Sequence, residues 1–313
     1  MIYPKFEDIQ VSTKTFIINT NLLIDIPQLY NNLPITNYIV IPKKRGRKKK
    51  VTVENPNKDI KNGSIITIKY GQELRGVEIK ENKNKNYFRN SVTIVIVIDG
   101  KLINFKLSRN GKFQMTGCKK DDHGEQCIKY IWDYIKDNKN IYKIIDIEHN
   151  IKNDLDPSKI VDKTDTDNLQ AIFVPAMRNI DFSLDFKVDR AELDKYINTM
   201  TDYNSLLETS IGYTGVNIKF PNYENINDLV INKMEYSNNS WEKSKYNYSD
   251  YIKMLNKKDY DKKINKKRYN TFLVFQSGKI IMSGTTAEWM KEPYEEFIEI
   301  IKECKHIIEE KLD

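Results

Sequence analysis

The hydrophobic positions in the first half of the chain form short runs that predict strands. A strand-like stretch at 9–19 precedes Asp25-Ile26-Pro27, where Asp is a suitable helix cap and Pro fits the first helical position. Residues 64–70 and 91–109 are rich in Ile and Val, which favours strands. A further short strand is expected at 111–117, so this half combines several strands with a short helix.

Helical spacing appears after the strands and then the whole order is repeated. Apolar residues within 127–135 recur with the period of an amphipathic helix. In the second half, residues 179–188 alternate as a strand does, and a helical apolar stripe follows. Residues 213–220 predict another strand, and 272–284 predict a hairpin. A last helix is expected to start after Pro293.

Two hairpin segments contain the same short motif. The segments "SRNGKFQMTG" (108–117) and "FLVFQSGKIIMSG" (272–284) share Gly-Lys, two residues, and Met-(Ser/Thr)-Gly. A motif that recurs in the same order of elements predicts an internal duplication. We therefore expect a first repeat at 1–148, a polar and acidic linker at 149–168, and a second repeat at 169–313.

Composition and charge argue against a disulfide-rich protein and a membrane-spanning one, and they place the excess charge in one segment. The chain has 313 residues, 39% of them hydrophobic, and three cysteines, Cys118, Cys127 and Cys304. So few cysteines argue against a disulfide framework and for a reducing compartment. The longest apolar run, 92–98, is too short to cross a bilayer, and we expect an intracellular protein. The net charge of +7 comes from one run, 43–50, which holds seven basic residues.

Several segments resemble the TATA-box-binding protein family. Residues 177–188, "MRNIDFSLDFKV", and 213–219, "YTGVNIK", are similar to successive strands of the family's second repeat, and 272–284 is similar to the hairpin that follows. In the first half, 110–119 is similar to the corresponding hairpin strand, and 4–13 matches loosely. The resemblance covers most of the chain apart from insertions near 41–62, 149–168 and 221–268.

The resemblance implies an α+β fold, in which two tandem repeats form a saddle-shaped antiparallel sheet with helices on its convex face. It implies a divergent DNA-binding transcription initiation factor, of a kind that large DNA viruses carry. The partners would be AT-rich double-stranded DNA, contacted in the minor groove, and a factor-IIB-like initiation factor or RNA polymerase. It implies no enzymatic activity and no cofactor, and a place in the nucleus, at a viral transcription site or in the virion.

The resemblance also implies which residues contact DNA. Asn179 falls at the family's minor-groove asparagine, while Tyr213 and Phe275 fall at positions of the phenylalanines that wedge base steps apart. Lysines at strand edges would hold phosphates. The expected contacts are Asn179, Tyr213, Phe275, Lys112, Thr116, Lys119, Lys219, Lys279, Ile281 and Ser283.

The sequence departs from the family pattern at several of these places. Ser108 stands where the first repeat would carry a wedge, and Gln114 occupies an apolar DNA-facing position. Asp181 falls on the expected concave face, where a carboxylate repels the groove or needs a partner. Asp8, or Ile9 after a slip of one residue, falls near the first-repeat asparagine. These departures favour an alternative function, a non-enzymatic interaction scaffold that kept the fold and lost specific TATA recognition.

The remaining motifs are less specific. Residues 42–50, "PKKRGRKKK", contain the Arg-Gly-Arg core of an AT-hook without its usual following proline, so DNA contact, nuclear import and a solvated loop all stay open. Cys118, His123 and Cys127 have C-x4-H-x3-C spacing, but a structural zinc site needs a fourth ligand and none is near in the sequence, so we expect no metal. A base-excision glycosylase is an alternative enzyme class, yet nothing marks its catalytic lysine or aspartate. The expected DNA contacts of the basic run are Lys43, Lys44, Arg45, Arg47 and Lys48.

Neutralising the basic residues of 43–50 should weaken DNA binding on all sequences and flatten its salt dependence. Each lost phosphate contact lowers the slope of log K against log salt by about 0.9, which a titration by fluorescence anisotropy measures. An unchanged slope would place this run away from DNA. A loss confined to AT-rich duplexes would favour the AT-hook interpretation.

Overall fold

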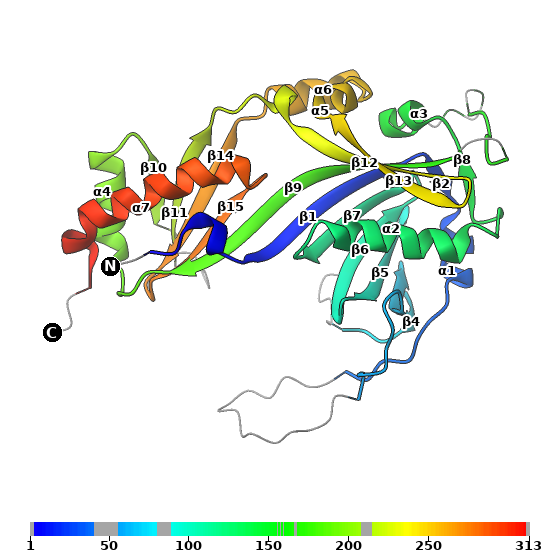
Figure 1. Cartoon of the computed structure of the whole chain (residues 1–313), viewed down its shortest axis with the longest axis horizontal. Coiled ribbons are helices and arrows are strands. Elements are labelled where there is room, and N and C mark those ends of the chain that lie inside the picture. Colours follow the sequence, from blue (N-terminus) through cyan, green and yellow to red (C-terminus); the bar gives the residue numbers. More distant parts are fainter. Residues whose placement is uncertain are drawn as a thin grey trace.

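One antiparallel sheet runs through the molecule and carries its two long helices on one face (Figure 1). The computed structural model describes residues 3–40, 56–79, 89–154, 156, 158, 160–165, 168–207 and 215–310. Within these residues the sheet has 13 strands, in the order β10-β11-β14-β15-β9-β1-β7-β6-β5-β3-β4, with β12 attached to β9 and β13 to β12. The expected α+β fold with a large antiparallel, saddle-like sheet is therefore confirmed.

The elements follow a similar order in both halves. The first half holds β1 (Val11–Thr20), β2 (Leu22–Ile24), α1 (Ile26–Asn32), β3 (Ile65–Tyr70), β4 (Glu73–Gly76), β5 (Ser91–Ile98), β6 (Lys101–Ser108), β7 (Lys112–Cys118), α2 (Asp122–Ile135), β8 (Tyr142–Ile144) and α3 (Ile147–Lys152). The second holds β9 (Leu169–Ser183), α4 (Arg190–Met200), β10 (Asn204–Leu207), β11 (Gly215–Asn222), β12 (Val230–Ser237), β13 (Ser240–Asn247), α5 (Tyr248–Lys253), α6 (Lys257–Ile264), β14 (Arg268–Phe275), β15 (Lys279–Gly284) and α7 (Glu288–Ile308). Two short 3-10 helices, η1 (Phe6–Asp8) and η2 (Ile226–Asp228), complete the list.

Each half builds its own core between the sheet and a long helix. In the first half, α2 buries Ile128 and Ile131 against the strands. In the second, α7 buries Phe297 against β14, where its ring stacks on Phe272 with centroids 4.1 Å apart and planes 10° apart. Burying one such side chain contributes about 1.5–3 kcal/mol. Figure 1 shows α2 and α7 lying across the same face of the sheet, so neither long helix covers the opposite face.

The two glycine hairpins occupy equivalent places in the two halves. Gly111 lies in the turn between β6 and β7, and Gly278 in the turn between β14 and β15. Each donates its backbone N–H to the residue three before it, at 2.9 Å, and each has a positive φ, +61° and +76°. A side chain on either would collide with a carbonyl oxygen of the segment after the first strand, Leu22 O or Phe186 O, each 2.3 Å away.

Backbone hydrogen bonds repeat around these hairpins as well. Asp25 N donates to Ile141 O at 2.8 Å, and Asp189 N donates to Ile308 O at 2.7 Å. Both aspartates also cap the following helix, α1 or α4, through their side chains. A capping aspartate thus links the start of the short helix to the chain after α2 in the first half and to the last residue of α7 in the second. The boundaries 1–148, 149–168 and 169–313 stay a prediction.

The start of the last helix differs from the expected one. The α7 helix begins at Glu288 and contains Pro293, whereas the sequence predicted a start after the proline. Pro293 has no N–H to donate to the carbonyl of Trp289, four residues earlier. That carbonyl instead accepts a hydrogen bond of 2.9 Å from Nδ2 of Asn270, a buried residue of β14. A side chain from the sheet therefore satisfies the group that proline leaves free.

Two segments expected to be irregular contain regular structure. The predicted linker includes the end of α3, and the polar insertion near 221–268 forms the hairpin β12–β13 and the helices α5 and α6. Asn150 of α3 is buried, and its Nδ2 donates to the carbonyls of Thr20, Leu22 and Asn110 at 2.7 to 3.0 Å. Among the described residues, no helix is both long and apolar enough to cross a membrane.

Gly278→Ala should destabilise the protein much more than Gly100→Ala. Gly100 also has a positive φ, +69°, but nothing lies within 4 Å of its Cβ position, so alanine there costs about 1 kcal/mol. Alanine at Gly278 adds a collision with Phe186 O, for a total of about 2–4 kcal/mol. Urea unfolding followed by circular dichroism measures both values. Equal losses would contradict the close approach of the hairpin to this segment.

Candidate nucleic-acid interface

The sheet face opposite α7 presents its side chains in ordered rows. Phe272, Val274, Ile280 and Met282 point to the helices and are buried in their core, so their alternating neighbours point away. One row of these neighbours runs Asn217, Leu273, Ile281 and Asp181 across β11, β14, β15 and β9, as the strand register shows. The row continues to the exposed Leu206 of β10, so Asn217 and Asp181 flank the apolar centre and a leucine completes the outer end.

A second, polar row lies next to the first. It runs Lys219, Thr271, Ser283, Asn179 and Thr13, and it continues from β9 into β1. Lys219 is exposed next to the outer end, which Asn204 of β10 completes, and its Nζ lies 5.8 Å from the centre of the Tyr269 ring. Asn179 is half-buried at the middle of the whole sheet. This row offers hydroxyl and amide groups with a cation near its outer end, a set suited to phosphates and base edges.

Phe275 ends β14 on the same face, three residues before the turn glycine. It is half-buried and faces away from the core in which Phe272 is fully buried. Lys279 starts the next strand and is exposed beside it. At the tip of a hairpin, an aromatic ring can enter a base step, and a cation beside it can hold the adjacent phosphate.

The corresponding face of the first half is polar. The matching row runs Ile17, Gln114, Lys106 and Thr93 across β1, β7, β6 and β5. Counted from the two turn glycines, Gln114 and Lys106 occupy the places of Ile281 and Leu273. Ser108 occupies the place of Phe275, and its hydroxyl lies 2.6 Å from Asn110 Oδ1. This half therefore lacks both the apolar floor and the wedge.

Part of this first-half face is also covered by the insertion in the second half. Ile172 and Val174 of β9, which lie on this face, pack with Tyr248 and Ile252 of α5 in a buried cluster. Asn19 of β1 donates a hydrogen bond of 3.2 Å to Oη of Tyr251 on the same helix. A ligand on this face would have to displace α5 before it reached the central strands of the first half.

Lys263 of α6 lies among several other cations on this covered side. Burial lowers the pKa of Lys263, and the neighbouring cations Lys266, Arg268 and Lys112 lower it further. Lys112 is itself exposed on the first-half face, as is Thr116. These cations leave the covered side positively charged without an apolar contact surface, which suits a backbone phosphate better than a base edge.

The other expected residues lie in different places. Lys119 is exposed after β7, at the approach to α2, and its backbone N–H donates to Nδ1 of His123 at 3.4 Å. Burial lowers the pKa of His123. Among the described residues, no group of three or more His, Cys, Asp or Glu side chains is placed to hold a metal ion. Tyr213 and the basic residues Lys43, Lys44, Arg45, Arg47 and Lys48 lie outside the described residues.

Asp8 and Ile9, which the sequence places near the first-repeat counterpart of Asn179, lie outside the sheet. Asp8 belongs to η1, before the sheet begins, and Ile9 follows it outside β1. Thr13 is the cross-strand partner of Asn179 in the pairing of the two central strands. Register shifts between Val11 and Thr13, and between Thr15 and Phe16, interrupt this pairing.

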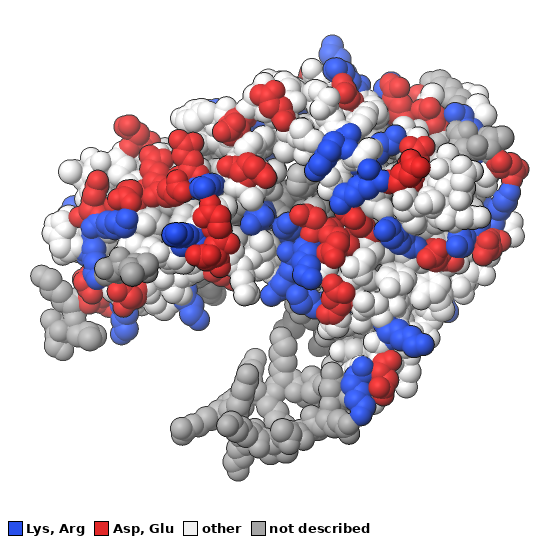
Figure 2. All heavy atoms as spheres, in the orientation of Figure 1, with Lys and Arg blue, Asp and Glu red and all other residues white. Residues whose placement is uncertain are grey.

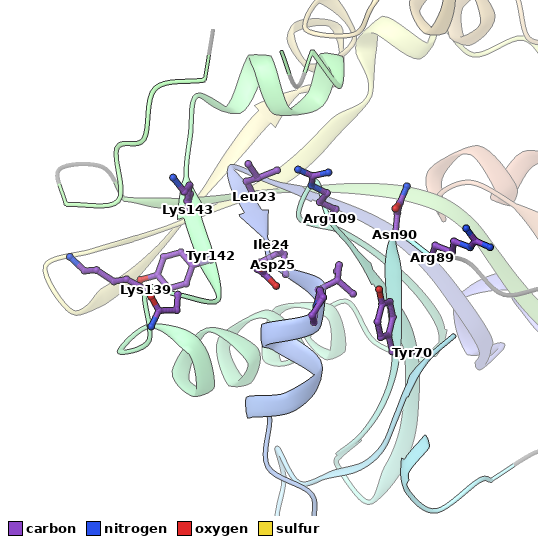
Figure 3. A pocket seen from close by; sticks show the side chains of 13 residues that line it. Leu23, Ile24, Asp25, Tyr70, Arg89, Asn90, Arg109, Lys139, Tyr142 and Lys143 are labelled. Carbon is purple, nitrogen blue, oxygen red and sulfur yellow. The ribbon is translucent and has the colours of Figure 1, made fainter. Parts of the chain in front are cut away.

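A basic cavity lies beyond the first-half hairpin. It measures 530 Å³ and is lined by Arg89, Arg109, Lys139 and Lys143, among others. Figure 3 shows these side chains arriving from the ends of several strands around the start of α1. Lys139 pairs with Asp165 and Lys143 with Asp162. Among the described residues, neither arginine has an ion-pair partner, so their guanidinium groups are available to a phosphate.

Charge on the helix-covered face argues against DNA binding there. Figure 2 shows acidic side chains gathered over α7. This helix carries Glu288, Glu292, Glu295, Glu296, Glu299 and Glu303. Clustered carboxylates repel phosphate groups, which leaves the opposite face of the second half as the candidate interface.

Comparison with known proteins gives two viral sequence relatives. No protein-family model matches the chain. It is 29% identical over 242 residues to a protein named TATA-box-binding protein-like from Acanthamoeba polyphaga mimivirus, a match that covers 72% of this chain and 57% of that protein. It is 24% identical over 240 residues to uncharacterized protein 335L of Invertebrate iridescent virus 6, covering 71% of this chain and 63% of that one. The matches thus span less than two thirds of either relative's length.

Among solved structures, the chain matches the TBP of Methanococcus jannaschii with a TM-score of 0.43 and 13% identity, over 96% of this chain and 99% of that one. The sequence matches to viral proteins are the more informative. They confirm the predicted resemblance: the chain is similar in sequence to the TATA-box-binding-like protein of a large DNA virus.

Proposed function

We propose that this protein is a transcription initiation factor that binds AT-rich promoter DNA in the minor groove, mainly through its second half. The observation that carries the proposal is the second-half face opposite α7. There Ile281, which is half-buried, and Leu273, which is buried, form an apolar floor, Phe275 lies at its tip, and Lys219 and Lys279 lie at its edges. The viral relative's name supports the same class of function.

Each part of this face has a role in the proposed complex. The apolar floor excludes water from the minor groove, and the ring of Phe275 enters a base step at the end of the contact. Unstacking one step costs a few kcal/mol, which wider contact along the bent groove offsets. Lys219 and Lys279 hold the phosphates on either side and supply affinity without sequence preference.

The two halves would act unequally on the DNA. Gln114 and Lys106 replace the apolar pair, Ser108 replaces the wedge, and α5 covers the neighbouring surface. A hydroxymethyl group cannot separate stacked bases, so the kink forms at one end only. The lysines of the first half and the two arginines of the basic cavity hold the straight part of the duplex by its phosphates. The protein therefore sits on its site in one direction.

The partners and location follow from the same proposal. The helix-covered face, which carries the acidic α7, would receive a factor-IIB-like initiation factor or RNA polymerase. The site of action would be the nucleus or a viral transcription site, with packaging in the virion as a further possibility. The basic run at 43–50 would add phosphate contacts near the DNA.

A second candidate is a protein-interaction scaffold that has lost specific TATA recognition. The covered, polar face of the first half favours it, because half of the expected DNA surface is replaced. The two candidates differ in DNA bending and in sequence preference. DNA binding alone does not separate them, since the basic run could bind DNA in either case.

Phe275→Ala should remove most of the bend and leave phosphate-driven binding in place. The measurement is fluorescence energy transfer across an AT-rich duplex labelled at both ends, with a GC-rich duplex beside it. The matched control is Ser108→Ala, the equivalent position of the first half, which should leave the bend unchanged. Wild-type protein should bend the AT-rich duplex more than the GC-rich one.

Two equal kinks, or a bend that survives Phe275→Ala, would contradict the unequal roles of the halves. Binding by wild-type protein with no bend and no sequence preference would reject the initiation-factor proposal in favour of the scaffold. Absence of any DNA binding would reject contact with DNA altogether.

A further inference from the structure

Asp181 places a negative charge at the inner edge of the candidate interface, where the second half meets the first. It belongs to β9, two residues after Asn179, and it is paired with Ile281 in the row of apolar side chains. Its side chain is exposed, and no hydrogen bond or ion pair joins it to another residue that the structure describes. Lys279 is its diagonal neighbour on β15, yet no ion pair forms between them.

The chemistry of this group restricts what can lie against it. An ionised carboxylate only accepts hydrogen bonds, and removing it from water without a donor is costly. In the minor groove, A·T and T·A pairs present only acceptors, at adenine N3 and thymine O2. The G·C pair adds one donor, the 2-amino group of guanine. A G·C pair is therefore the one base pair that can satisfy Asp181 from the groove floor.

Neighbouring groups on the same face add acceptors. Oδ1 of Asn179 and Oδ1 of Asn217 are both buried and without a hydrogen-bond partner in the described part of the chain. Asn217 lies in the same row as Asp181, and Asn179 lies one row away. An asparagine can turn its amide to present a donor instead, whereas Asp181 cannot while it is charged. Asp181 is therefore the one of these three side chains that requires a hydrogen-bond donor from the DNA.

We propose that Asp181 reads a guanine 2-amino group, so that the preferred DNA site contains a G·C base pair within an AT-rich sequence. This rests on the proposed function and specifies its DNA substrate. Because Asp181 lies close to Asn179 at the centre of the sheet, the G·C pair falls near the middle of the contacted site. Phe275 kinks the DNA at a base step that lies farther from the middle of the site, on the side of the second half.

The test compares G·C with inosine·C at each position of an AT-rich duplex. Inosine lacks the 2-amino group, so the two pairs are identical in the major groove and differ by the minor-groove amino group and its hydrogen bond to cytosine. Wild-type full-length chain should bind one position about tenfold more tightly with G·C than with inosine·C, within the usual discrimination of a base-edge contact. Asp181→Asn should lose this preference and gain affinity for the all-A·T duplex, because asparagine can donate to adenine N3 or thymine O2.

The matched control is Asp202→Asn, which removes the same charge from an exposed turn between α4 and β10. It should keep the preference for the 2-amino group, which excludes an effect of net charge. If the wild-type protein binds AT-rich DNA but treats G·C and inosine·C alike, or if Asp181→Asn keeps the preference, the role of Asp181 is overturned while the proposed function stands. If no duplex is bound at all, both are overturned.

Discussion

Backbone pairing between β1 and β9 joins the two halves into one sheet. The antiparallel register runs from Val11 opposite Ile180 to Thr20 opposite Ala171, with two shifts on the way. Each half has its own helix and its own core, so this pairing is what aligns the two faces. It also places Thr13 and Asn179 side by side at the centre. Without it, the rows of side chains would end at the edge of each half.

The insertion of the second half makes the two halves unequal. Beyond the register shifts, β9 continues along β1 and has Ile172 and Val174 on the face opposite α2. Apolar side chains in a row favour association with another surface. The chain covers them with α5 from its own insertion. This cover removes part of the first-half surface from any ligand.

Much of the fold could be predicted from the sequence because local rules decide it. The turn glycines Gly111 and Gly278, the capping aspartates Asp25 and Asp189, and the alternation around Phe272 all act through nearby backbone geometry. The same rules predicted strands, helices and their order in both halves. Pro293 predicted a later start of the last helix, but the helix begins before the proline. A tertiary contact makes this possible, because an asparagine from a distant strand donates a hydrogen bond to the carbonyl that the proline leaves free.

The sequence by itself determined the repeated order of elements, the opposite orientation of Phe272 and Phe275, and the presence of a charged Asp181 among expected DNA contacts. Only the tertiary structure decided that Thr13 is paired with Asn179, that Asn217 joins the row of Asp181, and that α5 covers the first-half face. The physical reason is that strand register and long-range packing join residues far apart in the chain. Bulges shift that register by amounts that no local pattern records.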